Sequence, residues 1–296
     1  REPDQIEVLR RIHQEDLSVR QTQRIVQEVL ARRDGSAPQG NGARPESRPL
    51  PVPPDFQRAE QGQVERLSSV LDAVLAGNGF SLAPMDAIVS EIEDSLEAAP
   101  EAAFASLASV GAEGNGGEGA ERWIEWHMLR VARVVLWVAR REGWDRDRRL
   151  RMGRCALLYD IGLRRVDPRL LSRQGPLSPA EHILVRRHVS YGEEVLQALP
   201  GIGPEAPQAA RDHHERTDGS GYLAGVGRDR IAEAAQWIGL ADAYVAMCER
   251  RPHREGFAPF RAMQVLQIEA RRGVYPEPLF RAFLAALSRY PLGSAV

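Results

Sequence analysis

The spacing of hydrophobic and polar positions is helical along almost the whole chain. Over 1–33, apolar residues recur every three or four positions between charged ones, which predicts one amphipathic helix. The stretch 34–55 is dense in Gly, Pro and Ser and predicts a linker. Helical spacing returns over 56–112, where no motif indicates a function. The pattern therefore predicts two helical segments ahead of the longest part of the chain.

From 121 to 296 the pattern predicts one compact domain. An apolar stripe runs from Ile124 to Val138 at helical spacing, and further helical segments follow to about residue 288. The alternation that is typical of a strand never extends beyond a few residues, and the sequence has no internal repeat. The predicted fold class is all-α, a helical bundle with an N-terminal helical region.

Composition excludes several kinds of chemistry. Hydrophobic residues make up 43% of the chain, and 39 basic against 41 acidic residues leave a net charge of −2, which argues against a surface for nucleic-acid polymers. The chain has no lysine, so a phosphate-binding site must use arginine. No apolar run reaches the ~18 residues of a membrane span, and the first residues do not resemble a signal peptide. We therefore expect a soluble cytoplasmic protein.

The two cysteines, Cys155 and Cys248, lie in apolar helical contexts. This placement favours free, buried thiols over a disulfide. Two cysteines are also too few for a zinc site built from thiolates.

Two aspartates lie inside apolar helical stretches, Asp160 in LLYDIG and Asp242 in GLADAYVAM. A buried carboxylate is costly unless a cation or hydrogen-bond donors compensate it. Five of the seven histidines lie between 127 and 214, and imidazoles commonly share a metal ion with carboxylates. A single histidine on an apolar helix, such as His127, is more often a core residue than a ligand, but together these residues indicate a metal site.

The segment HHERTDGSGYL at 213–223 resembles the signature HHExxDGxGYP of the HD-GYP family. Members of that family are helical, metal-dependent phosphodiesterases that hydrolyse cyclic di-GMP. Other segments agree in the same order: LLYDIG stands where the family has LLHDIGK, and WIGLADAYVAMCERRPHR resembles the helix with the last conserved aspartate of the family. The resemblance covers roughly 121–290 and implies the helical bundle of the HD superfamily.

The resemblance also implies the ligands of one or two ions, which Fe, Mn, Zn or Ni would fit. It implies six metal ligands: His127, Asp160, His188, His213, His214 and Asp242. Asp160 matches the aspartate that bridges two metals and is the candidate catalytic residue. Four further residues match substrate-binding positions: Arg251, Arg254, Gly221 and Tyr222.

Four positions depart from the family pattern. The histidine of the His-Asp pair is Tyr159, and the lysine that follows it is Leu163. The glutamate that some members carry one turn before the first histidine is Trp123, and the last residue of the Gly-Tyr-Pro triplet is Leu223. Because a neutral phenol is a poor metal ligand, we expect the position formed by His127, Asp160 and Asp242 to bind its ion more weakly than the position with three histidines. Arg164 and Arg165 are candidates to replace the missing lysine.

Two hypotheses follow. The first is a cyclic di-GMP phosphodiesterase with impaired activity. The second is a degenerate receptor for cyclic di-GMP, or a scaffold that binds signalling proteins through the loop that contains Gly221 and Tyr222 (the Gly-Tyr loop). The apolar spacing over 1–33 also permits a helix-pair interface between two copies of the chain, although packing within one chain explains it equally well.

Overall fold

The computed structural model describes residues 52–77, 81–109, 122–173, 175, 177–249 and 256–287. The predicted helix over 1–33 and most of the predicted linker lie outside these residues, as do Arg251 and Arg254. The described residues all belong to one compact unit, Pro49–Val296.

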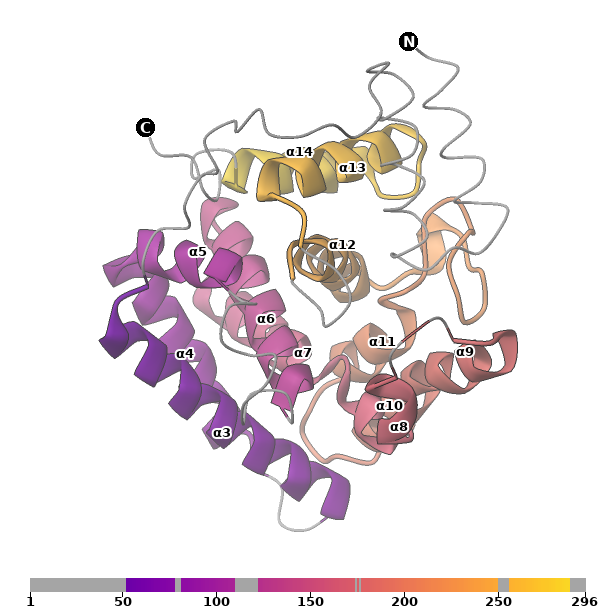
Figure 1. The fold of residues 1–296 in the computed structure, drawn as a ribbon, viewed down its shortest axis with the longest axis horizontal. Coiled ribbons are helices and arrows are strands. Elements are labelled where there is room, and N and C mark those ends of the chain that lie inside the picture. The colour runs from indigo at the N-terminus through magenta and orange to yellow at the C-terminus, as the bar shows by residue number, and fades with distance from the viewer. Residues whose placement is uncertain are drawn as a thin grey trace. The chain divides into compact units, whose positions relative to one another are not determined.

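The described part of the chain is helical and contains no strand, which confirms the predicted fold class (Figure 1). The α-helices are α3 (Pro54–Ala76), α4 (Ala83–Ala98), α5 (Pro100–Ser109), α6 (Trp123–Arg141), α7 (Arg146–Leu158), α8 (Pro168–Leu171), α9 (Pro179–Arg186), α10 (His188–Gln197), α11 (Glu205–Asp212), α12 (Glu233–Cys248), α13 (Pro259–Arg271) and α14 (Glu277–Leu287). Two 3-10 turns, η2 (Ile161–Arg165) and η3 (Arg228–Arg230), complete the set. In these residues we find no helix of the length and apolarity that a bilayer crossing needs.

Helix α6 is at the centre of the core and packs against α3, α4, α7, α12 and α14. Nearly every residue of α6 is buried, charged side chains included, because five other helices pack against it. Its buried Arg133 forms an ion pair with Glu60 of α3 and donates a hydrogen bond to the side chain of Gln63 (2.9 Å). An ion pair and a hydrogen bond therefore join α6 to α3 in addition to their apolar packing.

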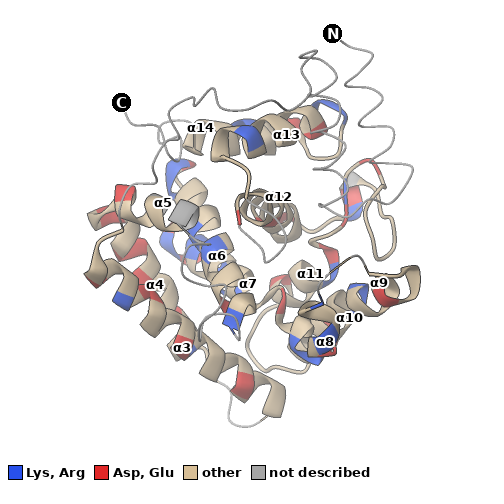
Figure 2. Ribbon diagram, in the orientation of Figure 1, with Lys and Arg blue, Asp and Glu red and all other residues tan. Residues whose placement is uncertain are grey.

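Ion pairs join α4 to the following helices. Arg154 of α7 forms a bidentate pair with Asp86 (2.5 and 2.6 Å), and Arg140 of α6 reaches Glu97 (3.2 Å). Figure 2 shows acidic residues along α3 and α4 and arginines along α6 and α7. The helices predicted over 56–112 therefore pack directly on the helices of the 121–296 region.

Local signals set the helix ends that surround the site. Ser178 and Glu181 form a capping box that starts α9. The sequence predicts one helix over 179–198, but the structure divides it at Arg187 into α9 and α10. Gly162 of η2 lies so close to α10 that a Cβ atom would stand 1.9 Å from the backbone oxygen of His188. This close approach brings η2, which directly follows Asp160, next to His188, the first residue of α10.

Neither cysteine forms a disulfide, as predicted. Cys155 is buried and Cys248 is partly buried. Burial raises the pKa of the Cys155 thiol to about 12, so this side chain is an unreactive core residue.

Candidate metal centre

The structure brings all six predicted ligand residues together in two groups that share Asp160. One group contains Asp160, His188, His213 and His214, and the other contains His127, Asp160 and Asp242. Within each group the candidate ligand atoms lie within 4.8 Å of one another. Asp160 follows α7, His188 opens α10, and His213 and His214 follow α11. Three helix ends therefore converge on one buried carboxylate.

Backbone carbonyls fix the orientation of two imidazoles. Nδ1 of His188 donates to the carbonyl oxygen of Val185 (2.8 Å), and Nδ1 of His213 donates to that of Ala210 (3.0 Å). A carbonyl oxygen can only accept, so Nδ1 carries a proton in both rings, and in the neutral form of each ring Nε2 holds a lone pair. These Nε2 atoms lie 3.3 Å (His188) and 3.4 Å (His213) from Oδ1 of Asp160, and 3.4 Å from each other.

This arrangement fits a cation. Oδ1 of Asp160 is buried and has no hydrogen-bond partner, so an anionic oxygen and two imidazole lone pairs face one another. Without an ion, this charge is compensated only by protonated rings: as imidazolium ions, His188 and His213 would hold the pKa of Asp160 well below its usual range, although burial opposes its ionisation. Burying a charge without compensation is costly, and an ion bound by these three atoms would supply it. The donor set of nitrogen and carboxylate oxygen fits Fe, Mn, Zn or Ni.

His214 lies at the edge of this group. Burial lowers the pKa of His214 well below its usual value, and the neighbouring His213 and His188 lower it further, so its ring is neutral. The ring of Tyr222 stacks on His214 at 4.6 Å between centroids, and the guanidinium of Arg186 lies 4.7 Å from the centre of the Tyr222 ring. The predicted substrate-binding Tyr222 therefore covers one candidate ligand.

In the second group, His127 and Asp242 are already hydrogen-bonded. Oδ1 of Asp242 accepts a hydrogen bond from the hydroxyl of Tyr159 (2.9 Å) and another from Nε2 of His127 (2.7 Å). Burial favours the neutral ring of His127, but the carboxylates of Glu249 and Asp242 outweigh it and raise its pKa to about 10. Asp242 thus has the partners that Asp160 lacks.

Glu249 and Arg130 lie beside His127 of this second group, and neither is among the residues predicted from the sequence. Oε2 of Glu249 accepts a hydrogen bond from Nδ1 of His127 (2.9 Å), and Oε1 accepts one from Arg130 (2.7 Å). All three side chains are buried. A signal was present in the sequence, because Glu249 follows Asp242 by seven residues, which is two helical turns on the same face.

The replacements for the missing lysine do not point into the site. Leu163 is buried in the apolar core. Arg164 donates to Ser68 of α3 (2.9 Å) and pairs with Glu125 of α6, while Arg165 pairs with Glu194 (3.2 Å). Neither arginine therefore takes the place of that cation in this structure.

The Gly-Tyr loop is held by its own glutamate. The carboxylate of Glu215 accepts hydrogen bonds from the backbone nitrogens of Ala224 (2.6 Å), Gly225 and Val226 (both 3.1 Å). Gly221 packs so tightly that a Cβ atom would lie 2.5 Å from the carbonyl oxygen of His214. The loop therefore lies directly against the backbone of His214, which belongs to the three-histidine group (Asp160, His188, His213 and His214).

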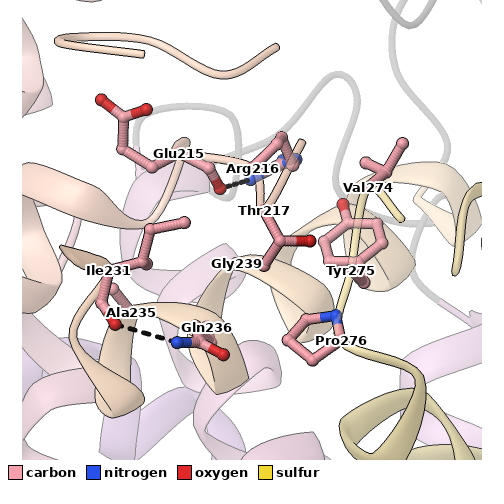
Figure 3. A pocket seen from close by; sticks show the side chains of 10 residues that line it. All are labelled: Glu215, Arg216, Thr217, Ile231, Ala235, Gln236, Gly239, Val274, Tyr275 and Pro276. Carbon is pink, nitrogen blue, oxygen red and sulfur yellow. Dashed lines mark hydrogen bonds between the residues drawn. The ribbon is translucent and has the colours of Figure 1, made fainter. Parts of the chain in front are cut away.

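A small pocket lies under this loop (Figure 3). Its lining comes from the loop, the start of α12 and the turn before α14: Glu215, Arg216, Thr217, Ile231, Ala235, Gln236, Gly239, Val274, Tyr275 and Pro276. The amide of Gln236 donates to the carbonyl of Ile231 and Arg216 donates to that of Glu215, both at 2.9 Å. No candidate metal ligand lines this pocket, and these two polar side chains are already bonded within it.

Comparison with known proteins agrees with this geometry. A cyclic di-GMP phosphodiesterase of Pseudomonas aeruginosa is 32% identical over 144 residues, which cover 49% of this chain and 34% of that protein. A 3'3'-cGAMP-specific phosphodiesterase of Vibrio cholerae is 33% identical over 165 residues, covering 56% of this chain and 35% of that protein. The chain spans about a third of the length of these curated relatives.

A solved structure shares the fold. An HDG"Y"P protein from Bdellovibrio bacteriovorus matches with a TM-score of 0.60 and 16% identity, over 90% of this chain and 80% of that one. The profile of the HD domain family matches residues 106–277, more than half of the chain. These findings confirm the resemblance read from the sequence. The chain belongs to the HD domain family.

Proposed function

We propose that this protein is a metal-dependent phosphodiesterase that hydrolyses cyclic di-GMP with reduced activity. The observation that carries the proposal is the unpartnered, buried Oδ1 of Asp160, which faces Nε2 of His188 and of His213. The curated relatives supply the substrate class, because their names specify cyclic di-GMP or 3'3'-cGAMP.

In this proposal Asp160, His188, His213 and His214 hold the principal ion. Such an ion, when bound, would supply an activated water and positive charge beside the phosphate. The chain's own contribution is orientation: the carbonyls of Val185 and Ala210 keep each Nε2 directed at Asp160. Asp160 is placed to serve both ligand groups because it belongs to each.

The proposed reduction in activity comes from the second group. Tyr159 contributes a hydrogen bond to Asp242 where an imidazole would contribute a ligand. Burial raises the pKa of Tyr159 well above its usual value, and the nearby carboxylates raise it further, so the phenol stays protonated. A second ion would then have His127, Asp160 and Asp242 only, and we expect it to bind more weakly than the first.

The proposed substrate contacts are Tyr222 and Gly221 of the loop, with Arg251 and Arg254 as phosphate-binding residues. The two arginines lie outside the described residues, so their role is a prediction from the family motif alone. Arginine suits it, since its planar guanidinium binds phosphate oxygens in pairs.

A second candidate function is a receptor for cyclic di-GMP, or a signalling scaffold, without hydrolysis. The hydrogen-bonded state of Asp242 favours it, because that carboxylate needs no ion for its burial. Exposed apolar side chains near the loop also favour it: Leu223 is 50% exposed, and Ile183 on α9 is 64% exposed. A protein partner at the loop, a homodimer through 1–33 and a cytoplasmic location stay predictions.

The test is anaerobic purification, metal quantitation and a cyclic di-GMP hydrolysis assay. We expect at least one ion per chain and slow turnover that Asp160→Asn abolishes. Cyclic di-GMP binding without turnover would select the receptor. A chain that binds neither metal nor nucleotide would overturn both functions.

A further inference from the structure

Glu249 contacts His127 on the side that faces away from the candidate ions. Its Oε2 lies 2.9 Å from Nδ1 of His127, whereas Nε2 of the same ring lies 2.7 Å from Asp242. An ionised carboxylate can only accept hydrogen bonds, so Nδ1 keeps its proton. The ring is therefore held with Nε2 towards Asp160 and Asp242.

The position of Glu249 is itself fixed. Its other oxygen, Oε1, accepts from the guanidinium of Arg130 (2.7 Å), which lies one helical turn after His127 on α6. Both side chains are buried, with 5% of Glu249 and 6% of Arg130 exposed. One carboxylate thus uses one oxygen for the imidazole and the other for a buried cation.

A histidine that binds a metal through one nitrogen commonly donates its other N–H to a carboxylate, which orients the ring and makes it a stronger ligand. In the three-histidine group, His188 and His213 donate to neutral carbonyls instead. Among His127, His188 and His213, it is therefore His127, the imidazole of the second group, whose Nδ1 donates to a carboxylate. We infer that Glu249 is a positioning residue that strengthens His127 as a ligand and partly offsets the imidazole lost at Tyr159.

This inference rests on the proposed metal centre, and its alternative is purely structural. Glu249 would then only compensate the buried charge of Arg130. The chain offers a matched comparison in Glu60, which forms a buried ion pair with Arg133 on the same helix α6. No hydrogen bond or ion pair of Glu60 in the described structure involves a candidate ligand.

The experiment titrates the full chain with Mn²⁺ by equilibrium dialysis and calorimetry, with thermal melting alongside. We expect Glu249→Gln to weaken the second, weaker ion about 10- to 100-fold and to leave the first ion unchanged. Glu60→Gln should lower the melting temperature without weakening either ion. Equal effects of Glu249→Gln and Glu60→Gln on the second ion would overturn the inference, as would no effect of Glu249→Gln.

The other outcomes separate this inference from the proposed function. A wild-type chain that binds one Mn²⁺ even at high concentration overturns the role of Glu249 and leaves the three-histidine site standing. A wild-type chain that binds none overturns the metal centre itself. If Glu249→Gln does not fold, Glu249→Asp replaces it: the shortened carboxylate should also weaken the second ion alone, and an unchanged second ion would overturn the inference.

Discussion

The hydroxyl of Tyr159 donates a hydrogen bond to Oδ1 of Asp242 across 2.9 Å, although the two residues are 83 positions apart in the chain. In the HD-GYP pattern the position of Tyr159 belongs to a histidine. The structure shows the consequence: Asp242 receives a proton donor where that pattern provides a second imidazole. The three-histidine group around Asp160 keeps an unpartnered carboxylate oxygen and therefore the stronger requirement for an ion.

Restoring the imidazole should strengthen the second metal position. Tyr159→His adds a nitrogen ligand beside Asp242, and we expect the second ion to bind about 10- to 100-fold more tightly. Hydrolysis of cyclic di-GMP should rise by about 100-fold or more, because one group that stabilises transition-state charge is typically worth about 100- to 1000-fold in kcat. Metal titration and product chromatography measure the two effects. Tyr159→Phe is the control, because it removes the hydroxyl without adding a ligand; a gain equal to that of Tyr159→His would contradict the explanation.

Removing the metal should destabilise the folded chain. An ion that binds only the folded state contributes about 2.7 kcal/mol at a hundredfold excess over its Kd. For a chain of this size we expect the chelator EDTA to lower the melting temperature by about 5–10 °C. Asp160→Asn should melt at the same temperature with and without chelator. A wild-type melting temperature that chelator leaves unchanged would count against a bound ion.

Arg164→Ala should be one of the most destabilising single changes outside the metal ligands. Its guanidinium pairs with Glu125, whose side chain is 2% exposed, and reaches Ser68 and Asp72 of α3. The substitution leaves a buried carboxylate unpaired, which typically costs about 3–5 kcal/mol. Urea unfolding measures the loss. Arg165→Ala removes a half-exposed pair with Glu194 and should cost at most about 1 kcal/mol. Equal losses of unfolding free energy in Arg164→Ala and Arg165→Ala would show that the buried carboxylate of Glu125 does not need Arg164 as its partner.

Glu269 on α13 should make stability fall as pH rises. Burial raises the pKa of Glu269 to about 7 in spite of Arg216 and Arg272, whereas the unfolded value is near 4.5. Between these values the folded state holds more protons, so the free energy of unfolding decreases as pH rises through about 4.5 to 7. The full shift corresponds to about 3 kcal/mol, and partial exposure reduces it to about 1–2 kcal/mol.

The measurement is urea unfolding of the metal-free wild type and of Glu269→Gln at pH 5 and pH 7.5. Because glutamine is neutral throughout, the variant should lose less stability than the wild type over this range, and their difference isolates Glu269 from the histidines. Parallel pH dependence of the two proteins would show that Glu269 ionises normally.

Local patterns in the sequence were sufficient for the fold class. Helical spacing predicted the helical segments, because a helix that is buried on one face has apolar residues every three or four positions. This spacing is visible in the sequence without knowledge of what the helix packs against. The division at Arg187 was missed, since α9 and α10 are nearly continuous and the apolar spacing runs across the break. The six candidate ligands were named from a motif resemblance, and the structure places their ligand atoms in two groups that share Asp160.

Three features depended on tertiary structure. Tyr159 was expected to be a poor ligand, but only the packing of α7 against α12 shows that it bonds to Asp242. Glu249 meets His127 over 122 residues of chain, and Arg164 turns to α3 and Glu125 instead of the site. Such contacts depend on which side chains the fold brings within about 3 Å, a distance that periodicity along one chain does not encode. The sequence by itself determined which residues are candidate metal ligands. The tertiary structure decided which of them bond to other side chains, as Asp242 does, and which have no such partner among the described residues, as is the case for Oδ1 of Asp160.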